Sequence, residues 1–135
     1  ELSTAIKGRS NLYVQMRSVM ESAEKSLYVA SSSYELTNKF KMFKETFAKL
    51  NKRKVDIKVI VSDDESEAKK LSKKFSVPIE SKPLNSRFII SDKTELIFTI
   101  KPNNVHEDFD YGIWINSPFF INSLAYMFDV AWKVK

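Results

Sequence analysis

The chain has 135 residues, a net charge of +5 and a hydrophobic content of 43%, which fit one globular domain and exclude an intrinsically disordered segment. It contains no cysteine, so disulfides, thiolate catalysis and thiolate metal sites are excluded. Its only glycines, Gly8 and Gly112, are too few for a Walker loop or a dinucleotide-binding loop.

The amino-terminal stretch, Glu1 to Arg9, lacks the basic and apolar regions of a signal peptide. No apolar run approaches the roughly 20 residues that cross a membrane. We therefore expect a cytoplasmic protein without membrane contact. Because the sequence does not begin with methionine, we also expect that it belongs to a longer chain.

The first predicted helix covers residues 10–25, with Ser10 as its N-cap. A short apolar strand, residues 27–31, follows and ends in three serines at positions 31–33. These serines lie where ligands bind in an open α/β sheet, but we favour the interpretation that they cap the next helix. The apolar face of the first helix consists of Leu12, Met16, Val19, Met20 and Ala23.

A second helix is predicted over residues 35–51, with an apolar seam that packs against a sheet. The seam consists of Phe40, Phe43, Phe47 and Leu50, and the candidate nucleic-acid contacts beside it are Lys41, Lys44, Lys52 and Arg53. Because the phenylalanines occupy the buried face, no aromatic side chain alternates with the lysines for base stacking. A solvated lysine-rich surface is the preferred interpretation, and direct nucleic-acid binding remains the alternative.

A strand over residues 55–61 precedes the third predicted helix, residues 65–75. Ser62 and Glu65 have the spacing of a capping box. The acidic residues 63–65 could suggest a metal site or acid–base chemistry, but carboxylates at a helix start are explained by the helix dipole. Residues 77–79 are expected to be extended.

Two strands, residues 87–91 and 96–100, flank a polar turn at 92–95 and predict a tight hairpin. The first strand is apolar on both sides, as expected of an interior strand with both faces covered. Polar residues at the ends of such a strand are held by a rigid scaffold. The ends of this strand are therefore where any chemistry would be located.

The remaining elements are a polar loop, a strand over residues 111–115 and a final helix from Pro118 to about Trp132, with Ser117 as N-cap. The loop holds His106, the single histidine, beside two acids, but consecutive residues converge poorly on one ion, so no metal site and no cofactor are predicted. The expected buried side of the final helix consists of Phe120, Leu124, Met127, Phe128 and Ala131. The order of elements predicts an α/β fold, a mixed sheet flanked by helices on both faces.

The hairpin resembles the phospholipase-D-like motif, in which His-x-Lys is followed by four residues, an aspartate and a return strand. Asn85 stands at the histidine position, Arg87 at the lysine position and Asp92 at the aspartate position. Thr99 and Ile100 replace the usual Gly-Ser of the return strand. The resemblance implies a phospholipase-D-like fold without the nucleophile, since an amide cannot attack phosphorus as imidazole does.

The end of the chain resembles the TrmB family of archaeal, sugar-responsive transcriptional regulators. This resemblance rests on the run Gly112-Ile-Trp-Ile-Asn-Ser-Pro118 with Leu124, Phe128 and Trp132, and on Ile6 to Arg9 at the start of the domain. It implies a single regulatory domain over 1–135, excised from a chain with an upstream winged-helix DNA-binding domain.

On this basis the expected function is a non-catalytic effector-binding or dimerisation domain. It would work as a homodimer, take a sugar or anion as effector and reach DNA through the absent domain. Asn85, Arg87 and Asp92 would form the ligand or dimer contact, with Arg87 holding a carboxylate or phosphate. The equal alternative for Arg87 is a salt bridge with Asp92 or with another acid at the edge of the core. A divergent phosphodiesterase using His106 is a third, disfavoured, hypothesis.

Overall fold

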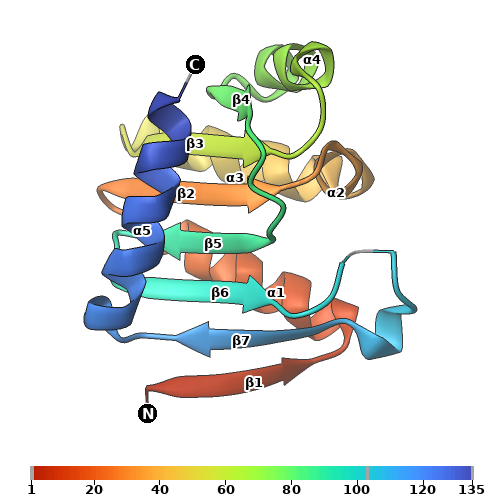
Figure 1. Ribbon diagram of the computed structural model, residues 1–135, viewed down its shortest axis with the longest axis vertical. Helices are drawn as coiled ribbons and strands as arrows, with labels where there is room; N and C mark the ends of the chain where they lie inside the picture. The colour runs from red at the N-terminus through yellow and green to blue at the C-terminus, as the bar shows by residue number, and fades with distance from the viewer. Residues whose placement is uncertain (1, 103, 135) are drawn as a thin grey trace.

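The computed structural model describes residues 2–102 and 104–134, which form a single seven-stranded sheet in the order β1-β7-β6-β5-β2-β3-β4 (Figure 1). Strand β2 is parallel to β3, and β3 to β4, whereas every other neighbouring pair is antiparallel. The strands are β1 Ser3–Lys7, β2 Ser26–Ser31, β3 Asp56–Val61, β4 Ile79–Ser81, β5 Phe88–Ser91, β6 Glu95–Thr99 and β7 Tyr111–Ile115.

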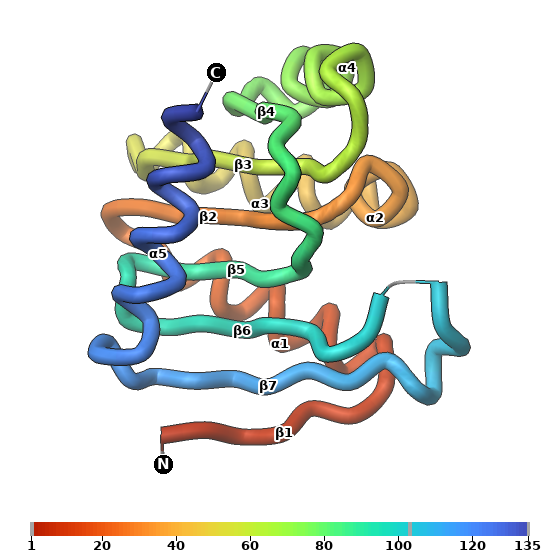
Figure 2. The backbone as a smooth tube through the Cα atoms, in the orientation of Figure 1, coloured from red at the N-terminus to blue at the C-terminus, as the bar shows by residue number. Residues whose placement is uncertain are grey.

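Helices cover both faces of this sheet, and four of the five helices lie on one side (Figure 1). The helices are α1 Arg9–Glu21, α2 Ser33–Asn38, α3 Phe40–Lys52, α4 Glu65–Phe75 and α5 Pro118–Lys133, with a 3-10 turn, η1, at Glu107–Phe109. Within the described residues, helix α5 is the one helix on the second face, where its tube crosses the strands (Figure 2). The predicted mixed α/β sheet with helices on both faces is confirmed.

Each face of the sheet has its own hydrophobic core, as the alternation of side chains along a strand requires. Beneath α1 to α4, the core includes Leu27 and Val29 of β2. On the other face, Tyr28 and Ala30 of the same strand meet α5, and the Tyr28 ring stacks on Phe128 at 4.5 Å between centroids. Strand β2 is thus covered on both sides, as its continuous apolar run indicates.

The edge strand β1 was not predicted from the sequence. Ile6 is the only buried residue among Ser3–Lys7, because β1 pairs only with β7 and its other side chains face solvent. An apolar alternation is therefore missing, and the strand is defined by its backbone pairing alone.

The predicted helix over 35–51 is wrong in one respect: it is divided into α2 and α3 at Lys39, whose backbone leaves the helical region. The predicted serine cap is confirmed, because the Ser32 side chain accepts a hydrogen bond from the Glu35 backbone N–H at 3.1 Å. Two other predicted caps are wrong. Helix α1 begins after Gly8 rather than after Ser10, and the α4 cap is Asp64, where a carboxylate is also favoured by the helix dipole.

The β5–β6 hairpin turns at Asp92 and Lys93, which both have positive φ, 54° and 57°. The Asp92 carboxylate accepts backbone hydrogen bonds from Glu24 (3.0 Å), Lys25 (2.7 Å) and Ser26 (3.0 Å). Burial raises the pKa of Asp92, but these hydrogen bonds outweigh burial and hold the pKa below its usual value. Asp92 thus fixes the hairpin to the chain that enters β2.

We predict that Asp92→Asn lowers the free energy of unfolding by about 1 kcal/mol at pH 7, since asparagine tolerates positive φ but carries no charge for these hydrogen bonds. Because the pKa of Asp92 is lower in the folded than in the unfolded protein, its charge stabilises the fold at pH values above the unfolded pKa of roughly 4, and this contribution disappears as the pH falls through the folded pKa. Urea denaturation of wild type and variant at pH 7 and at pH 2.5 measures the difference in free energy of unfolding at each pH. A difference between wild type and variant that persists at pH 2.5 would contradict this account.

Candidate functional site

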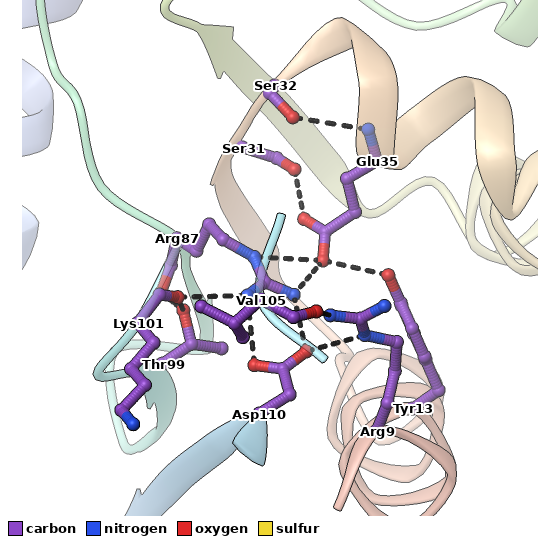
Figure 3. Close-up of polar contacts among 10 residues, drawn as sticks. All are labelled: Arg9, Tyr13, Ser31, Ser32, Glu35, Arg87, Thr99, Lys101, Val105 and Asp110. Carbon is purple, nitrogen blue, oxygen red and sulfur yellow. Dashed lines mark hydrogen bonds and ion pairs between the residues drawn. The ribbon is translucent and has the colours of Figure 1, made fainter. Parts of the chain in front are cut away.

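A cluster of charged side chains lies where several strands of the sheet begin or end (Figure 3). Arg87 directly precedes β5, Asp110 directly precedes β7, and Glu35 belongs to α2, which follows the end of β2. Arg9 begins α1, immediately after β1. We call these four residues the ion cluster.

Arg87 is the centre of the ion cluster. Its Nε and Nη2 donate to Oε2 of Glu35, at 3.1 and 2.6 Å, and its Nη1 donates to Oδ1 of Asp110 at 3.1 Å. Nη1 also donates to the Lys101 carbonyl at 3.1 Å, and Nη2 approaches Oδ2 of Asp110 at 3.5 Å. All five N–H groups of the guanidinium are directed at acceptors of this chain.

The remaining members complete the pairing of charges. Asp110, which is fully buried, also accepts from Nε of Arg9 at 2.9 Å, and Arg9 donates to the Val105 carbonyl at 2.7 Å. Glu35, 1% exposed, accepts hydrogen bonds from the hydroxyls of Ser31 and Tyr13. Two cations therefore face two carboxylates, which is the condition for burying charge without a large penalty.

This environment changes the acidity of the groups around Glu35. Burial raises the pKa of the Tyr13 hydroxyl above its ordinary value, and the nearby Glu35 carboxylate raises it further. Burial alone lowers the pKa of Arg87, but the two carboxylates outweigh burial and keep it raised. Tyr13 is thus a neutral donor and Arg87 a fixed cation.

The three predicted motif residues do not share one site. Arg87 lies inside the ion cluster, Asn85 is exposed on the segment before it, and Asp92 lies at the far end of β5. Of the two interpretations left open for Arg87, the salt bridge with an acid at the edge of the core is the one observed. An anion could reach the guanidinium only by displacing Glu35 or Asp110, so anion capture there stays a prediction.

A pocket of about 570 Å³ opens next to the ion cluster. Residues 84–87, in the segment that runs past the ends of β3 and β2 (Figure 2), form one wall, and α5 contributes Phe120, Leu124 and Met127. The polar lining includes Ser31, Ser32, Ser62, Asn85, Ser86 and Thr99. Asn85 therefore does line a cavity, at the carboxyl ends of the parallel strands β2 and β3, where ligands bind in open α/β sheets.

The four predicted nucleic-acid contacts lie on or directly after α3, and all four residues are exposed. Two of them also interact within the chain: Lys44 donates to the Lys74 carbonyl at 3.1 Å, and Arg53 donates to the Glu21 carbonyl at 2.8 Å. Lys41 and Lys52 face solvent. Contact with DNA remains a prediction for all four residues.

His106 lies in an exposed loop, where its Nδ1 accepts a hydrogen bond from the Asp108 backbone N–H at 3.2 Å. Within residues 2–102 and 104–134, no group of three His, Asp or Glu side chains could hold a metal ion. No helix in these same ranges is both long enough and apolar enough to span a bilayer.

Sequence reasoning missed Glu35, Asp110, Arg9 and Tyr13 as members of the site. Glu35 lies 52 residues from Arg87, and Asp110 lies 23 residues away. One local signal was available for Glu35, which stands at the start of a predicted helix next to a strand that is apolar on both sides. No spacing rule connects these acids to Arg87, since the contact is made only by the folded sheet.

We predict that Arg87→Met lowers the free energy of unfolding by about 3–5 kcal/mol, because the substitution leaves Glu35 and Asp110 buried without their central cation. Urea denaturation with circular dichroism measures the change. The matched control is Arg17→Met, which removes ion pairs at the surface with Glu21 (3.1 Å) and Glu45 (3.6 Å) and should cost less than about 1 kcal/mol. Equal losses in the two variants would refute a dominant role for the ion cluster.

Comparison with known folds places the sheet and helices among phospholipase-D-like structures. The chain superposes on TrmBL2, described as an archaeal chromatin protein with a novel mode of DNA binding, with a TM-score of 0.74 and 15% identity. The match covers 98% of this chain and 52% of TrmBL2, so this chain spans about half the length of that protein.

Two smaller proteins match along almost their whole length. Nuc of Salmonella typhimurium, a phospholipase D family member, has a TM-score of 0.69 and 15% identity, over 96% of this chain and 94% of its own. NucT from Helicobacter pylori has a TM-score of 0.72 and 10% identity, over 97% and 95%. At these identities the likeness establishes the fold alone.

A search of curated protein sequences finds no match. The family model described as "Transcriptional regulator TrmB, EBD N-terminal subdomain" matches residues 3–134. This match covers nearly the whole chain, and the phospholipase-D-like fold agrees with the resemblance seen in the hairpin. The chain therefore belongs to the TrmB family of transcriptional regulators.

Proposed function

We propose that this domain is a non-catalytic sensor that binds a small effector, works as a homodimer and controls a DNA-binding domain elsewhere in a longer cytoplasmic, archaeal regulator. The observation that carries the proposal is the pocket beside the ion cluster. It lies at the carboxyl ends of β2 and β3 and combines neutral polar groups with apolar side chains. Such a lining is typical of small-molecule sites.

The absence of catalysis is supported by the chemistry of the motif residues. Asn85 offers no nucleophile for attack on phosphorus. Arg87 has all five N–H groups directed at Glu35, Asp110 and the Lys101 carbonyl. A phosphodiesterase that used His106 would need this exposed histidine to move from its loop into the pocket, which His106 does not line.

The charge balance favours a neutral effector over an anion. The only charged residues among those that line the pocket are Arg87 and Lys101. Arg87 is paired, and the Lys101 ammonium lies over the rings of Phe109 and Tyr111, at 5.6 and 5.5 Å. A neutral polyol such as a sugar can hydrogen-bond to the serine, threonine and asparagine groups while its apolar face meets Phe98 and Leu124.

We predict that at least one neutral mono- or disaccharide stabilises the domain, whereas inorganic phosphate does not. A ligand at 100 times its Kd adds about 2.7 kcal/mol, or roughly 8 °C in Tm for a domain of this size. Thermal denaturation against a sugar panel measures the shift. Ser86→Trp should abolish the shift by filling the pocket, and Ser66→Trp, at an exposed serine of α4, should leave it intact.

A shift with phosphate but with no sugar would overturn the preference for a neutral ligand. A shift that survives Ser86→Trp would place the ligand outside this pocket. Sugar titrations followed by nuclear magnetic resonance identify the contacted residues in either case.

Direct DNA binding is the second candidate, supported by the exposed lysines of the neighbouring helices α3 and α4. It predicts that Lys41→Glu with Lys52→Glu weakens binding to duplex DNA at least tenfold and reduces its salt dependence, because phosphate contacts release counterions. Fluorescence anisotropy at several salt concentrations measures both effects. Lys7→Glu with Lys93→Glu makes the same change in net charge at exposed positions on β1 and in the β5–β6 hairpin, and an equal loss there would rule out a specific interface.

A further inference from the structure

Helix α5 is apolar on two opposite sides, although only one side contacts the sheet. Ile121, Ala125 and Phe128 are buried against the second core. The opposite side carries an outer stripe of exposed apolar side chains, interrupted by the exposed Ser123. The stripe consists of Phe119 (92% exposed), Tyr126 (70%), Met127 (52%) and Val130 (47%), together with Val134 (56%) directly after the helix. Met127 and the 46%-exposed Phe120 were predicted to be buried, and the structure corrects both predictions, because they flank the buried side rather than occupy it.

The outer stripe is large for a free surface. An aromatic side chain contributes about 150–250 Å², so Phe119 and Tyr126 together expose on the order of 300 Å². This already reaches the ~300–600 Å² of the largest apolar patches on monomers, which are often functional. It is more than a third of the ~800 Å² that one partner buries in a standard interface, before Met127, Val130 and Val134 are added.

The charges of α5 also set it apart from the rest of the chain. The helix carries two charged residues, Asp129 and Lys133, in a protein in which 29% of residues are charged. Asp129 accepts a hydrogen bond from the Tyr28 hydroxyl at 2.7 Å and so belongs to the packed side. Lys133 lies at the carboxyl end of the stripe. Two copies of a protein with net charge +5 could therefore approach through this surface with little repulsion.

The spacing of residues along the stripe suits an antiparallel pair of α5 helices, in which each end of one helix lies beside the opposite end of the other. Tyr126 lies at the middle of α5, with Phe119 seven residues before it and Lys133 seven residues after it. Residues seven apart lie within about 20° of the same helical face. A two-fold axis through Tyr126 would place each Lys133 opposite a Phe119 ring, an arrangement that favours cation–π contact. The two lysines would be roughly 20 Å apart along the helix.

We propose that the outer stripe of α5 binds the same stripe of a second copy, with the two helices antiparallel and crossing at Tyr126. This inference rests on the proposed function and supplies its dimer interface, which the sequence had assigned to the motif residues. The contact is isologous, so it closes after two copies. A parallel arrangement would bring the two Lys133 side chains together and is disfavoured by their repulsion.

The interface would also be coupled to the pocket. Phe120, Leu124 and Met127 of α5 line the pocket, and Met127 belongs to the outer stripe as well. An effector that moves α5 would therefore change the surface that meets the second copy. This gives the effector a physical route to the arrangement of the dimer.

The first test is sedimentation equilibrium of the 135-residue chain, without ligand, from 1 to 300 µM. We expect a monomer–dimer equilibrium, with Tyr126→Lys raising the Kd of the dimer at least tenfold. Val14→Lys, which replaces an exposed apolar residue of α1, is the matched control and should leave the Kd unchanged. A monomer at every concentration, or a dimer equally weakened by both variants, overturns the proposal.

The second test uses the absence of cysteine from the chain. Helices packed 8–10 Å apart bring Cα atoms at their crossing point within disulfide reach, about 4.4–6.8 Å. Tyr126→Cys should therefore form a disulfide-linked dimer under mild oxidation, whereas Phe119→Cys should not link to itself. Both variants alter exposed positions, and circular dichroism verifies their folding.

Equal cross-linking of the two variants would rule out the antiparallel crossing, and no cross-linking of Tyr126→Cys would rule out the interface. Because neither test uses an effector, failure here is distinct from failure of the sensor proposal, which the Ser86→Trp experiment addresses.

Discussion

The ion cluster around Arg87 is the constraint on which the functional edge of this domain depends. A buried guanidinium requires partners for all its N–H groups, and here Glu35, Asp110 and the Lys101 carbonyl provide them. Glu35 belongs to α2, Asp110 directly precedes β7, and Lys101 follows β6. Arg9, at the start of α1, donates to the Asp110 carboxylate as well. The ends of elements far apart in the chain are thus held together by matched charges in addition to the apolar core that they share.

The same pairing shapes the chemistry of the neighbouring pocket. Because Arg87 and Arg9 are balanced by Glu35 and Asp110, little unpaired charge remains to attract an anion. The amide of Asn85, the hydroxyl of Ser86 and the serine hydroxyls at the ends of β2 and β3 then give the cavity its polarity. At Asn85, where the resemblance to the phospholipase-D-like motif implies the histidine position, the side chain is an amide, and the proposal of recognition rather than reaction takes this into account.

Helix α5 connects this pocket with the outside of the molecule. It is the only helix on its face of the sheet among the described residues. One side of it packs on β2, β5 and β6, one edge lines the pocket, and its outer stripe is exposed. In the proposed mechanism, the effector and the second copy would therefore both contact helix α5.

The sequence by itself determined the fold class, the caps at Ser32 and Ser117 and the hairpin at Asp92, because these depend on local spacing and on apolar periodicity. The family was indicated by the resemblance of the end of the chain to known regulators. It did not determine β1, whose single buried residue, Ile6, leaves no periodic signal. Phe120 and Met127 belong to the apolar pattern predicted for the buried side of the last helix, and only the tertiary structure decided that both are exposed. Glu35 and Asp110 became partners of Arg87 for the same reason: the sheet order brings together strand ends that are distant in the chain, and no local rule encodes that order.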